Sequence, residues 1–262
     1  MPSKSELRQK WNNAGKDVVV LHMFPRSRTS PNISPYMVKL ETYLRVAGID
    51  YINDFQQPTS SKGKSPWMTF NGRDMADSQH CIEHLGRTLN KDLSAHLSPV
   101  EKATARGMRA VLEDHFYFCL VMSNWVFGDL TFLRDEVFPP FPIPNFMVNL
   151  VLKRIRSKLK AQCEGQGIGR HSEEEIGAMG VQDLKAVSDF LGEKTFMMGD
   201  KPTELDCVVF GFVASKLFNS KDSDVFYRAI EEQFPNLKAH CLMMKEKYWP
   251  DWEECKYQPD RK

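Results

Sequence analysis

The stretch Gly63–Ser78 reads GKSPWMTFNGRDMADS. Two short runs that suit strands, Trp67–Phe70 and Arg73–Ala76, flank the pair Asn71-Gly72, and Asn-Gly between two strands is a strong signal for a β-hairpin. The next residues, Asp77 and Ser78, are of types that commonly cap the start of a helix. The stretch therefore predicts a hairpin that leads directly into a helix.

The residues before this hairpin predict a strand, a helix and a second strand. Val18–Phe24 is a nearly continuous apolar run, which is typical of a central strand buried on both faces. After a polar loop, apolar residues recur at helical spacing from Pro35 to Ala47, which predicts a helix that ends at Gly48. Asp50–Phe55 is then a second strand. This order of elements predicts a small mixed sheet with the thioredoxin topology.

The second half of the chain contains no convincing strand. Ser98-Pro99-Val100-Glu101 combines a capping box with a proline at the first helical position, and predicts a long helix towards Trp125. Further helices are predicted after Ser172, from Thr203 to about Asn219, and from about Pro235 to Tyr248, and a proline-rich loop is predicted at Val137–Phe146. We therefore expect a thioredoxin-like domain at 17–92 and an all-helical domain at 98–250, flanked by a polar N-terminal segment at 1–16 and a polar tail at 251–262.

Composition excludes several classes of protein. The formal net charge of +1 is too small to attract a nucleic-acid backbone. The longest uncharged stretch is broken by prolines and falls short of the ~20 apolar residues of a membrane span. The N-terminus lacks the apolar run of a signal peptide, and the scattered cysteines and histidines show no metal-ligand spacing, so we expect a cytoplasmic protein without a metal.

The first candidate site is Ser34, at the start of the first predicted helix. Free N–H groups and the positive end of the helix dipole stabilise an anion there, and a thiolate is such an anion. Lowering a thiol pKa from ~8.5 to ~6.5 requires ~2.7 kcal/mol, which the dipole and one hydroxyl donor can supply. Ser34 or Tyr36 could be that donor. Alternatively, Ser34 only caps the helix and Tyr36 packs against its neighbours.

Two more candidate sites lie within the opening stretch. In thioredoxin-like folds, the loop before the third strand carries a cis-proline, and the residue before it presents its backbone to a peptide-like ligand. Ser65-Pro66 occupies that position, unless it is an ordinary loop proline. At the next helix, Ser78 and the free N–H groups could hold a carboxylate while Asp77 receives an ammonium group. Alternatively, this pair is a second helix cap.

Together, Gly63-Lys64-Ser65-Pro66-Trp67 and Asp77-Ser78 resemble the glutathione-binding half of the glutathione transferases. In the second half, Gly199–Asp206 resembles the buried capping box of these proteins, in which Thr203 caps a helix and Asp206 reaches back to it. The resemblance implies a glutathione transferase fold, with glutathione as co-substrate. Carried over residue by residue, it implies that glutathione is bound by Ser34, Lys64, Ser65, Pro66, Asp77 and Ser78.

Three motifs resemble, more narrowly, the failed axon connections family, which is metaxin-like. They are Ile33–Tyr36 with Lys39–Thr42, Gly167–Ser172, and Asp206–Gly211, and the similarity runs from about Val18 to Trp249. Ser34 stands where cysteine-type relatives carry a nucleophilic thiol, so mixed-disulfide chemistry at this loop is excluded. The resemblance implies instead that Ser34 donates a hydrogen bond to the thiolate of glutathione. Arg170 and His171 receive no chemical role.

Two functions follow as hypotheses. The first is a glutathione-dependent transferase that conjugates, isomerises or reduces a small hydrophobic electrophile, with Ser34 as the catalytic residue. The electrophile would lie between the domains, beside walls supplied by the proline-rich loop and by Tyr36, Trp67, Phe116 and Trp125. The second is a non-catalytic adaptor that uses the same fold to bind protein partners. Either protein could be a homodimer.

Overall fold

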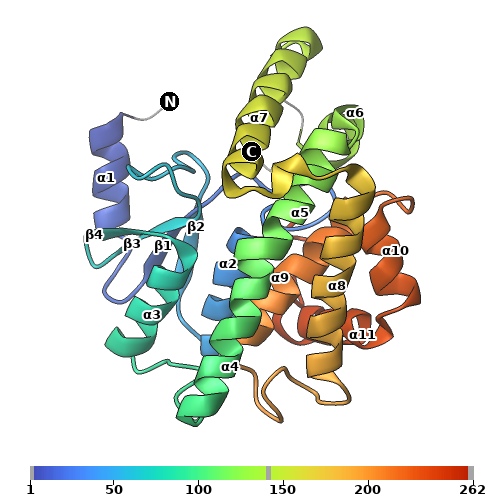
Figure 1. Cartoon of the computed structure of the whole chain (residues 1–262). Coiled ribbons are helices and arrows are strands. Elements are labelled where there is room, and N and C mark those ends of the chain that lie inside the picture. The colour runs from blue at the N-terminus through green and yellow to red at the C-terminus, as the bar shows by residue number, and fades with distance from the viewer. Residues whose placement is uncertain (1–2, 140–142, 259–262) are drawn as a thin grey trace.

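The computed structural model describes residues 3–139 and 143–258, and contains a sheet domain followed by a helical domain (Figure 1). Four strands lie in the order β2-β1-β3-β4, namely Tyr51–Asp54, Val19–His22, Trp67–Phe70 and Arg73–Ala76. β1 pairs with β2 in parallel and with β3 antiparallel, and β3 pairs antiparallel with β4. The predicted thioredoxin-like topology and hairpin are confirmed.

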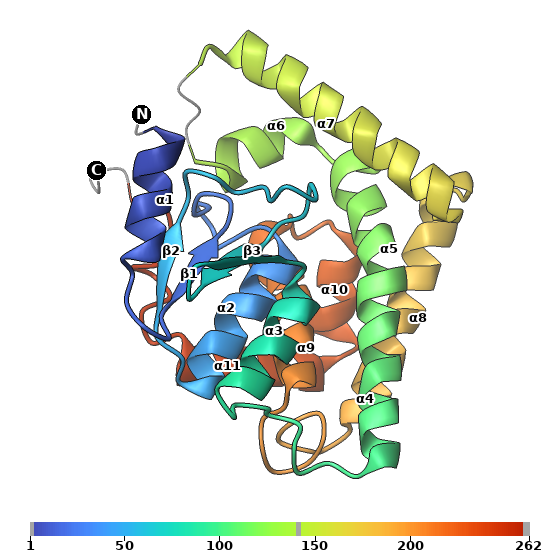
Figure 2. The same cartoon turned by 90° about the vertical axis from the view of Figure 1, so that its left-hand side faces the viewer.

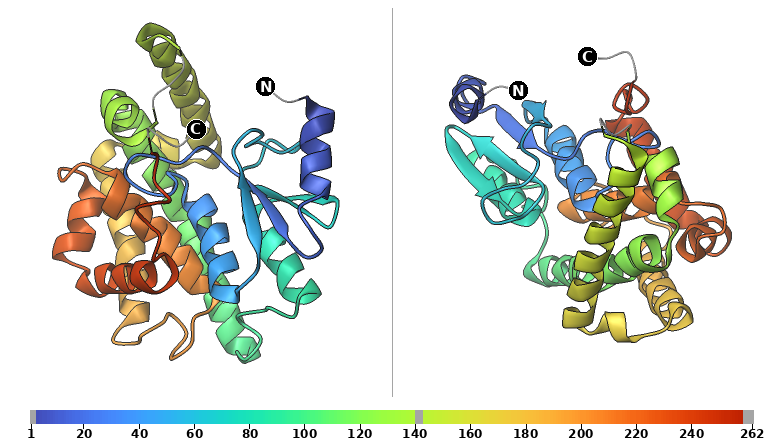
Figure 3. Two further views of the ribbon diagram at one scale, coloured as in Figure 1. Left: turned by 180° about the vertical axis from the view of Figure 1, so that it is seen from behind. Right: turned by 90° about the horizontal axis from the view of Figure 1, so that it is seen from above.

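Two helices cover one face of the sheet. Helices α2 (Pro35–Ala47) and α3 (Ser78–Thr88) bury their apolar sides against alternate residues of β1 and β3, such as Leu21 and Met68. Gly48 ends α2 in the left-handed conformation that its sequence predicts. Seen from behind, α2 lies between the sheet and the helical domain, so this helix belongs to both cores (Figure 3).

The N-terminal segment is not the featureless polar segment that we predicted. Its helix α1 (Lys4–Asn12) covers the other face of the sheet (Figure 2). Leu7 and Trp11 are buried there together with Val20 and Trp67. A capping box at the start of α1 and the four-residue spacing of these two apolar residues were the signals that could have revealed the helix.

The helical domain begins with one long helix over Pro99–Phe127, as predicted, although parts of it are π-helical. Two further predicted helices are confirmed. They are α8 (Glu173–Leu191), which has Ser172 as its N-cap, and α9 (Glu204–Asn219), which has Thr203 as its N-cap. In order, the segments are α4 (Pro99–Ala110), η1 (Val111–Phe116), α5 (Tyr117–Val121), η2 (Met122–Phe127), α6 (Leu130–Phe132), η3 (Leu133–Val137), α7 (Asn145–Gln166), η4 (Ile168–Arg170), α8 (Glu173–Leu191), α9 (Glu204–Asn219), α10 (Val225–Glu232) and α11 (Pro235–Tyr248).

Within the described ranges, no single helix is long and apolar enough to cross a membrane. One sharply bent pair, Pro99–Phe127 with Leu130–Val137, passes the same test of length and composition. The predicted proline-rich loop does lead into a helix, α7, but its residues 140–142 lie outside the described part of the chain.

The predicted polar tail also packs against the body of the protein. Trp252 is buried in the helical core, and the N–H of Tyr257 donates to the carbonyl of Ser27 in the loop after β1. Asp251 accepts two hydrogen bonds from the Arg45 guanidinium on α2. The last described residues therefore join the helical domain to the loop that precedes α2.

Candidate functional site

The predicted glutathione-binding residues lie at one end of the sheet. In the strand register, His22 at the end of β1 lies beside Trp67 at the start of β3, which lies beside Ala76 at the end of β4. The loop that leaves β1, the Ser65-Pro66 pair and the Asp77-Ser78 pair must therefore emerge next to one another. The three segments that carry the predicted residues thus start from the same end of the sheet.

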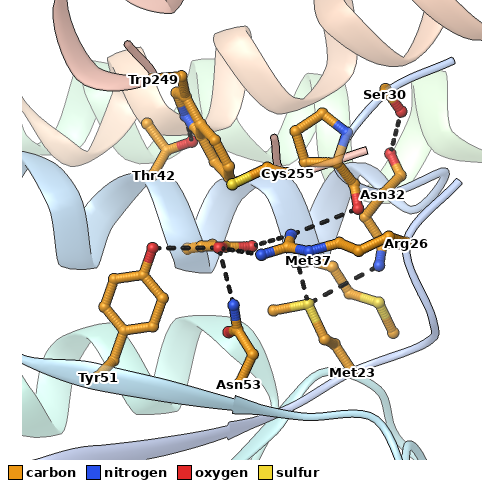
Figure 4. Close-up of polar contacts among 12 residues, drawn as sticks. Met23, Arg26, Ser30, Asn32, Met37, Thr42, Tyr51, Asn53, Trp249 and Cys255 are labelled. Atoms are coloured by element: carbon orange, nitrogen blue, oxygen red, sulfur yellow. Dashed lines mark hydrogen bonds and ion pairs between the residues drawn. The ribbon is translucent and has the colours of Figure 1, made fainter. Parts of the chain in front are cut away.

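The loop that positions Ser34 is held by buried polar contacts (Figure 4). The guanidinium of Arg26 donates to both carboxylate oxygens of Glu41, at 2.7 and 2.8 Å, and Glu41 is almost completely buried. Tyr51 and Asn53 donate to the same carboxylate. A buried, fully bonded ion pair allows few alternative arrangements, so the loop from β1 to α2 has a fixed path.

The end of this loop leaves the Ser34 side chain free. The buried amide of Asn32 donates to the carbonyl of Phe24 and accepts from the N–H of Ser34 at 3.1 Å. Ser34 is half-buried, and its hydroxyl makes no cap bond to α2. No described residue bonds that hydroxyl or the N–H of Tyr36, so two donors at the start of α2 remain available to an anion.

The close contact of α2 with α9 fixes the direction of these donors. A methyl group added at Gly211 of α9 would lie 2.5 Å from the carbonyl oxygen of Pro35. Only glycine permits this approach, because any larger residue would force the first turn of α2 away. The helical domain therefore sets the position of the Ser34 end of α2.

The second predicted segment has the expected backbone. The Ser65–Pro66 peptide bond is cis. The Ser65 hydroxyl donates to the carbonyl of Pro58, and both backbone groups of Lys64 are bonded to Ser60. Among the described residues none bonds the N–H or the carbonyl of Ser65, so its backbone is free to pair with a peptide-like ligand. The exposed ammonium group of Lys64 projects from the same loop.

The third segment, Asp77-Ser78, caps α3 and still has hydrogen-bonding groups without a partner among the described residues. Oδ1 of Asp77 accepts from the N–H groups of Gln79 and His80, as the capping alternative predicted. No described group bonds its second oxygen, or the hydroxyl and N–H of the buried Ser78. Asp77 has φ 85°, a left-handed conformation that costs a residue other than glycine about 1–3 kcal/mol and that tends to occur at binding sites.

A buried charge cluster beside these segments was missed by the sequence analysis. Lys39 of α2 is completely buried, and its ammonium group donates to Glu113 at 2.6 Å and to Gln79 at 2.7 Å. Gln79 in turn donates to Glu204 at the start of α9. This cluster joins α2, α3 and the helical domain directly behind the Asp77 cap. Lys39 was visible in the sequence only as part of a family motif.

Three of the four predicted wall residues have other roles. The Tyr36 hydroxyl donates to the backbone carbonyl of Glu113, so it is not free to donate to a thiolate, and burial raises its pKa well above the ordinary value. Phe116 is completely buried in the helical core against Phe212 and Phe226. Both are held by contacts between the domains or within the helical bundle, which one-dimensional spacing does not reveal.

Trp67 also lies elsewhere than predicted. Because side chains alternate along a strand, its ring points to the α1 face of the sheet, where it stacks on His22 with 3.6 Å between ring centroids. There it lines a cavity of about 680 Å³ together with Trp11 and His80. None of the six predicted glutathione-binding residues lines that cavity.

The fourth predicted wall residue, Trp125, lies near the end of the long helix. It is half-buried, and its ring lies 6.0 Å from that of Phe138. The N–H of Arg28 donates to the carbonyl of Val137, and its guanidinium donates to that of Phe138. The loop after β1 therefore lies against the segment that carries these aromatic rings, which places apolar surface of the helical domain next to the Ser34 loop.

Comparison with known proteins agrees with this architecture. The family model "Glutathione S-transferase N-terminal domain" matches residues 35–130, and "Glutathione S-transferase, C-terminal domain" matches residues 180–244. A solved glutathione transferase family member from Pseudomonas fluorescens pf-5, with two glutathione bound, has a TM-score of 0.54 at 16% identity, over 94% of this chain and 96% of its own. The chain belongs to the glutathione S-transferase family.

Within that family it is similar to Failed axon connections and to metaxins, as its motifs indicated. It is 33% identical to Failed axon connections of Drosophila melanogaster over 96% of this chain, but it spans only 64% of that protein. It is 30% identical to the isoprene-epoxide–glutathione S-transferase of Rhodococcus sp. (strain AD45), over 69% of this chain and 79% of that one. Metaxin-2 of Mus musculus is 22% identical over 74% of this chain and 73% of its own length.

Proposed function

We propose that this chain is a glutathione-dependent transferase that acts on a hydrophobic electrophile. The observation that carries the proposal is the meeting of three segments, at Ser34, Ser65 and Asp77-Ser78, each of which leaves polar groups without partners among the described residues. Groups of this kind at one edge of a fixed scaffold suit a peptide-like ligand with charged ends. Its six cysteines are all unpaired thiols, and we propose a cytoplasmic location, where thiols remain reduced.

In this proposal glutathione lies across the end of the sheet. The Ser34 hydroxyl and the N–H of Tyr36 hold its thiolate, and the backbone of Ser65, next to Pro66, pairs with its cysteinyl backbone. The hydroxyl and N–H of Ser78 donate to the γ-glutamyl carboxylate, the free oxygen of Asp77 accepts from the ammonium group, and the Lys64 ammonium group binds the other carboxylate. The thiolate then attacks an electrophilic carbon and forms a thioether. With an epoxide, the ring carbon–oxygen bond breaks as the carbon–sulfur bond forms, and the alkoxide takes a proton from solvent.

The second substrate would lie near Trp125 and Phe138. Both rings are partly accessible, and Arg28 in the loop after β1 donates to the main-chain carbonyl group of Phe138. An apolar wall would bind the hydrophobic part of an electrophile and exclude water from the thiolate. The related isoprene-epoxide–glutathione S-transferase is named for an electrophile of this class, a small epoxide.

The first prediction is that glutathione stabilises the folded chain. A ligand that binds only the native state adds RT ln(1 + [L]/Kd), or about 2.7 kcal/mol at 100 times Kd. We expect thermal unfolding to shift upward by several degrees in about 10 mM glutathione, and much less with S-methylglutathione, which has no ionisable thiol. Calorimetric titration would give the affinity. An unchanged melting temperature and no heat of binding would exclude the transferase proposal.

The alternative is a non-catalytic adaptor, and either protein could use an exposed apolar strip on α7 to contact another chain. The outward face of α7 exposes Phe146, Met147, Leu150 and Val151, with Phe146 at 67% and Leu150 at 64% exposure. This end of α7 projects beyond the rest of the protein (Figure 1). Neighbouring apolar side chains at such exposure are typical of a protein interface. We propose that this strip, defined by those four residues, binds a second copy of the chain in a homodimer.

The second prediction tests that strip. Leu150→Asp places a charge at its centre and is expected to convert a dimer to a monomer in sedimentation velocity, because an unpaired carboxylate would be buried at the interface. Ser157→Asp, at an exposed position on the same helix outside the strip, is the control and should leave the dimer intact. A wild-type protein that sediments as a monomer would contradict the homodimer and leave the strip to an adaptor's partner.

A further inference from the structure

Three potential metal ligands come together in the helical domain, away from the candidate glutathione site. His115 and Cys119 lie on the long helix, and Asp183 lies on α8. Their ligand atoms all lie within 4.8 Å of one another, and Nδ1 of His115 is 2.6 Å from Oδ2 of Asp183. We predicted no metal from the sequence, but His115 and Cys119 are four residues apart and share a helix face.

The carboxylate in this cluster lacks a permanent positive partner. Asp183 is only 14% exposed, and within the described residues its one ion-pair partner is His115, which is charged only when protonated. Burial raises the pKa of Asp183 above its ordinary value, although the hydrogen bond from His115 opposes this. A half-buried carboxylate without a lysine or arginine favours the approach of a cation.

The backbone around the cluster has two special features. The helix that carries His115 is π-helical over Val111–Phe116, and such wide turns occur frequently at functional sites. On α8, Gly180 lies one turn before Asp183, and a methyl group there would lie 3.2 Å from Cβ of Cys119 and closer still to Phe226. Glycine at this position lets α8 approach closely enough for Asp183 to reach the other two ligands.

We propose that His115, Cys119 and Asp183 bind one zinc ion, with solvent as the fourth ligand. Zinc accepts sulfur, nitrogen and oxygen ligands in a tetrahedron whose corners are about 3.3–3.6 Å apart, so rotation of the half-exposed His115 side chain would complete the site. Magnesium and calcium prefer oxygen ligands alone and do not suit this set. The exposure rises from the fully buried Cys119 to the half-exposed His115, so the ion and its solvent ligand have a path from the surface.

Binding must release a proton. Burial raises the pKa of the Cys119 thiol to about 12, so without metal the sulfur is protonated at neutral pH. The zinc–sulfur bond forms as the sulfur–hydrogen bond breaks, and the proton passes to solvent. Zinc affinity should therefore increase with pH, because the sulfur binds as a thiolate.

The test uses cobalt as a spectroscopic substitute for zinc, with metal-free full-length protein and no glutathione present, because glutathione itself binds these metals. We expect one equivalent of Co²⁺ to give a thiolate-to-cobalt charge-transfer band and the visible spectrum of a tetrahedral site, and Zn²⁺ to displace it. Cys119→Ser should abolish the charge-transfer band. Cys163→Ser, at another fully buried cysteine of the same core, is the matched control and should retain it.

A second variant tests the proposal even if Cys119→Ser does not fold. Asp183→Asn keeps the shape of the side chain and can still pair with His115, so the fold should survive, while metal affinity should fall about tenfold or more. Circular dichroism would confirm folding of each variant. The proposal is overturned if wild-type protein gives no tetrahedral cobalt spectrum, or if folded Cys119→Ser or Asp183→Asn binds cobalt as wild type does. Those results would leave the three residues as an ion pair beside a buried thiol.

Discussion

Asp206→Ala is expected to lower the free energy of unfolding by about 3–5 kcal/mol, the largest effect on stability that we predict for a single substitution. The carboxylate of Asp206 is completely buried. It accepts from the N–H and the hydroxyl of Thr203 at 2.8 and 2.9 Å, from the N–H of Met197 at 2.7 Å, and contacts Nε2 of His240 at 2.9 Å. Alanine would leave these donors buried without a partner.

The size of the loss in unfolding free energy distinguishes this buried network from an ordinary helix cap. An exposed capping box is worth about 1 kcal/mol, and Thr203→Ala should cost about that amount, because the main-chain donors to Asp206 remain. Asp200→Ala, at an exposed position in the same loop, is the control and should change stability by less than about 0.5 kcal/mol. Urea unfolding measures all three. A loss of only about 1 kcal/mol in Asp206→Ala would mean that the buried network contributes no more than a surface cap.

Ser34→Ala is expected to lower kcat/KM by about 10²–10³, the largest effect on activity, because it removes one preorganised hydroxyl donor from the thiolate. The pKa of the bound glutathione thiol should rise, as ultraviolet absorbance against pH would show, while glutathione affinity changes less. Ser34→Thr keeps a hydroxyl and should retain most of the activity. Ser34→Cys should shift the site towards thiol–disulfide exchange, since a helix N-terminus favours a reactive thiolate.

The structure sharpens this test, because the Ser34 hydroxyl makes no cap bond to α2. Ser34→Ala should therefore change stability by less than about 0.5 kcal/mol, and any loss of activity would reflect chemistry. Ser34→Asp should repel the thiolate and be inactive. A fully active Ser34→Ala or Ser34→Asp would rule out the catalytic role of this residue. The Tyr36 hydroxyl, already bonded to Glu113, could not replace it, which would leave the N–H of Tyr36.

Features that depend on near neighbours in the chain could be predicted before the structure was known. The hairpin at Asn71-Gly72, the start of α4 at Ser98 and the cap at Asp77 are each specified by a few adjacent residues, because turn and cap geometry is local. The pairing of Thr203 with Asp206 spans one helical turn and was predictable for the same reason. The order of these signals along the chain was enough to predict a thioredoxin-like domain followed by a helical one.

Tertiary structure alone decided which side chains remain available for chemistry. Trp67, Phe116 and Tyr36 look alike in sequence as aromatic candidates, but the first faces α1, the second is buried in the helical core, and the hydroxyl of the third bonds Glu113. The buried pair of Lys39 with Glu113 likewise joins residues of two domains. Such contacts depend on how elements distant in sequence pack together, since burial and hydrogen bonding are set by whatever surface the fold brings opposite each side chain.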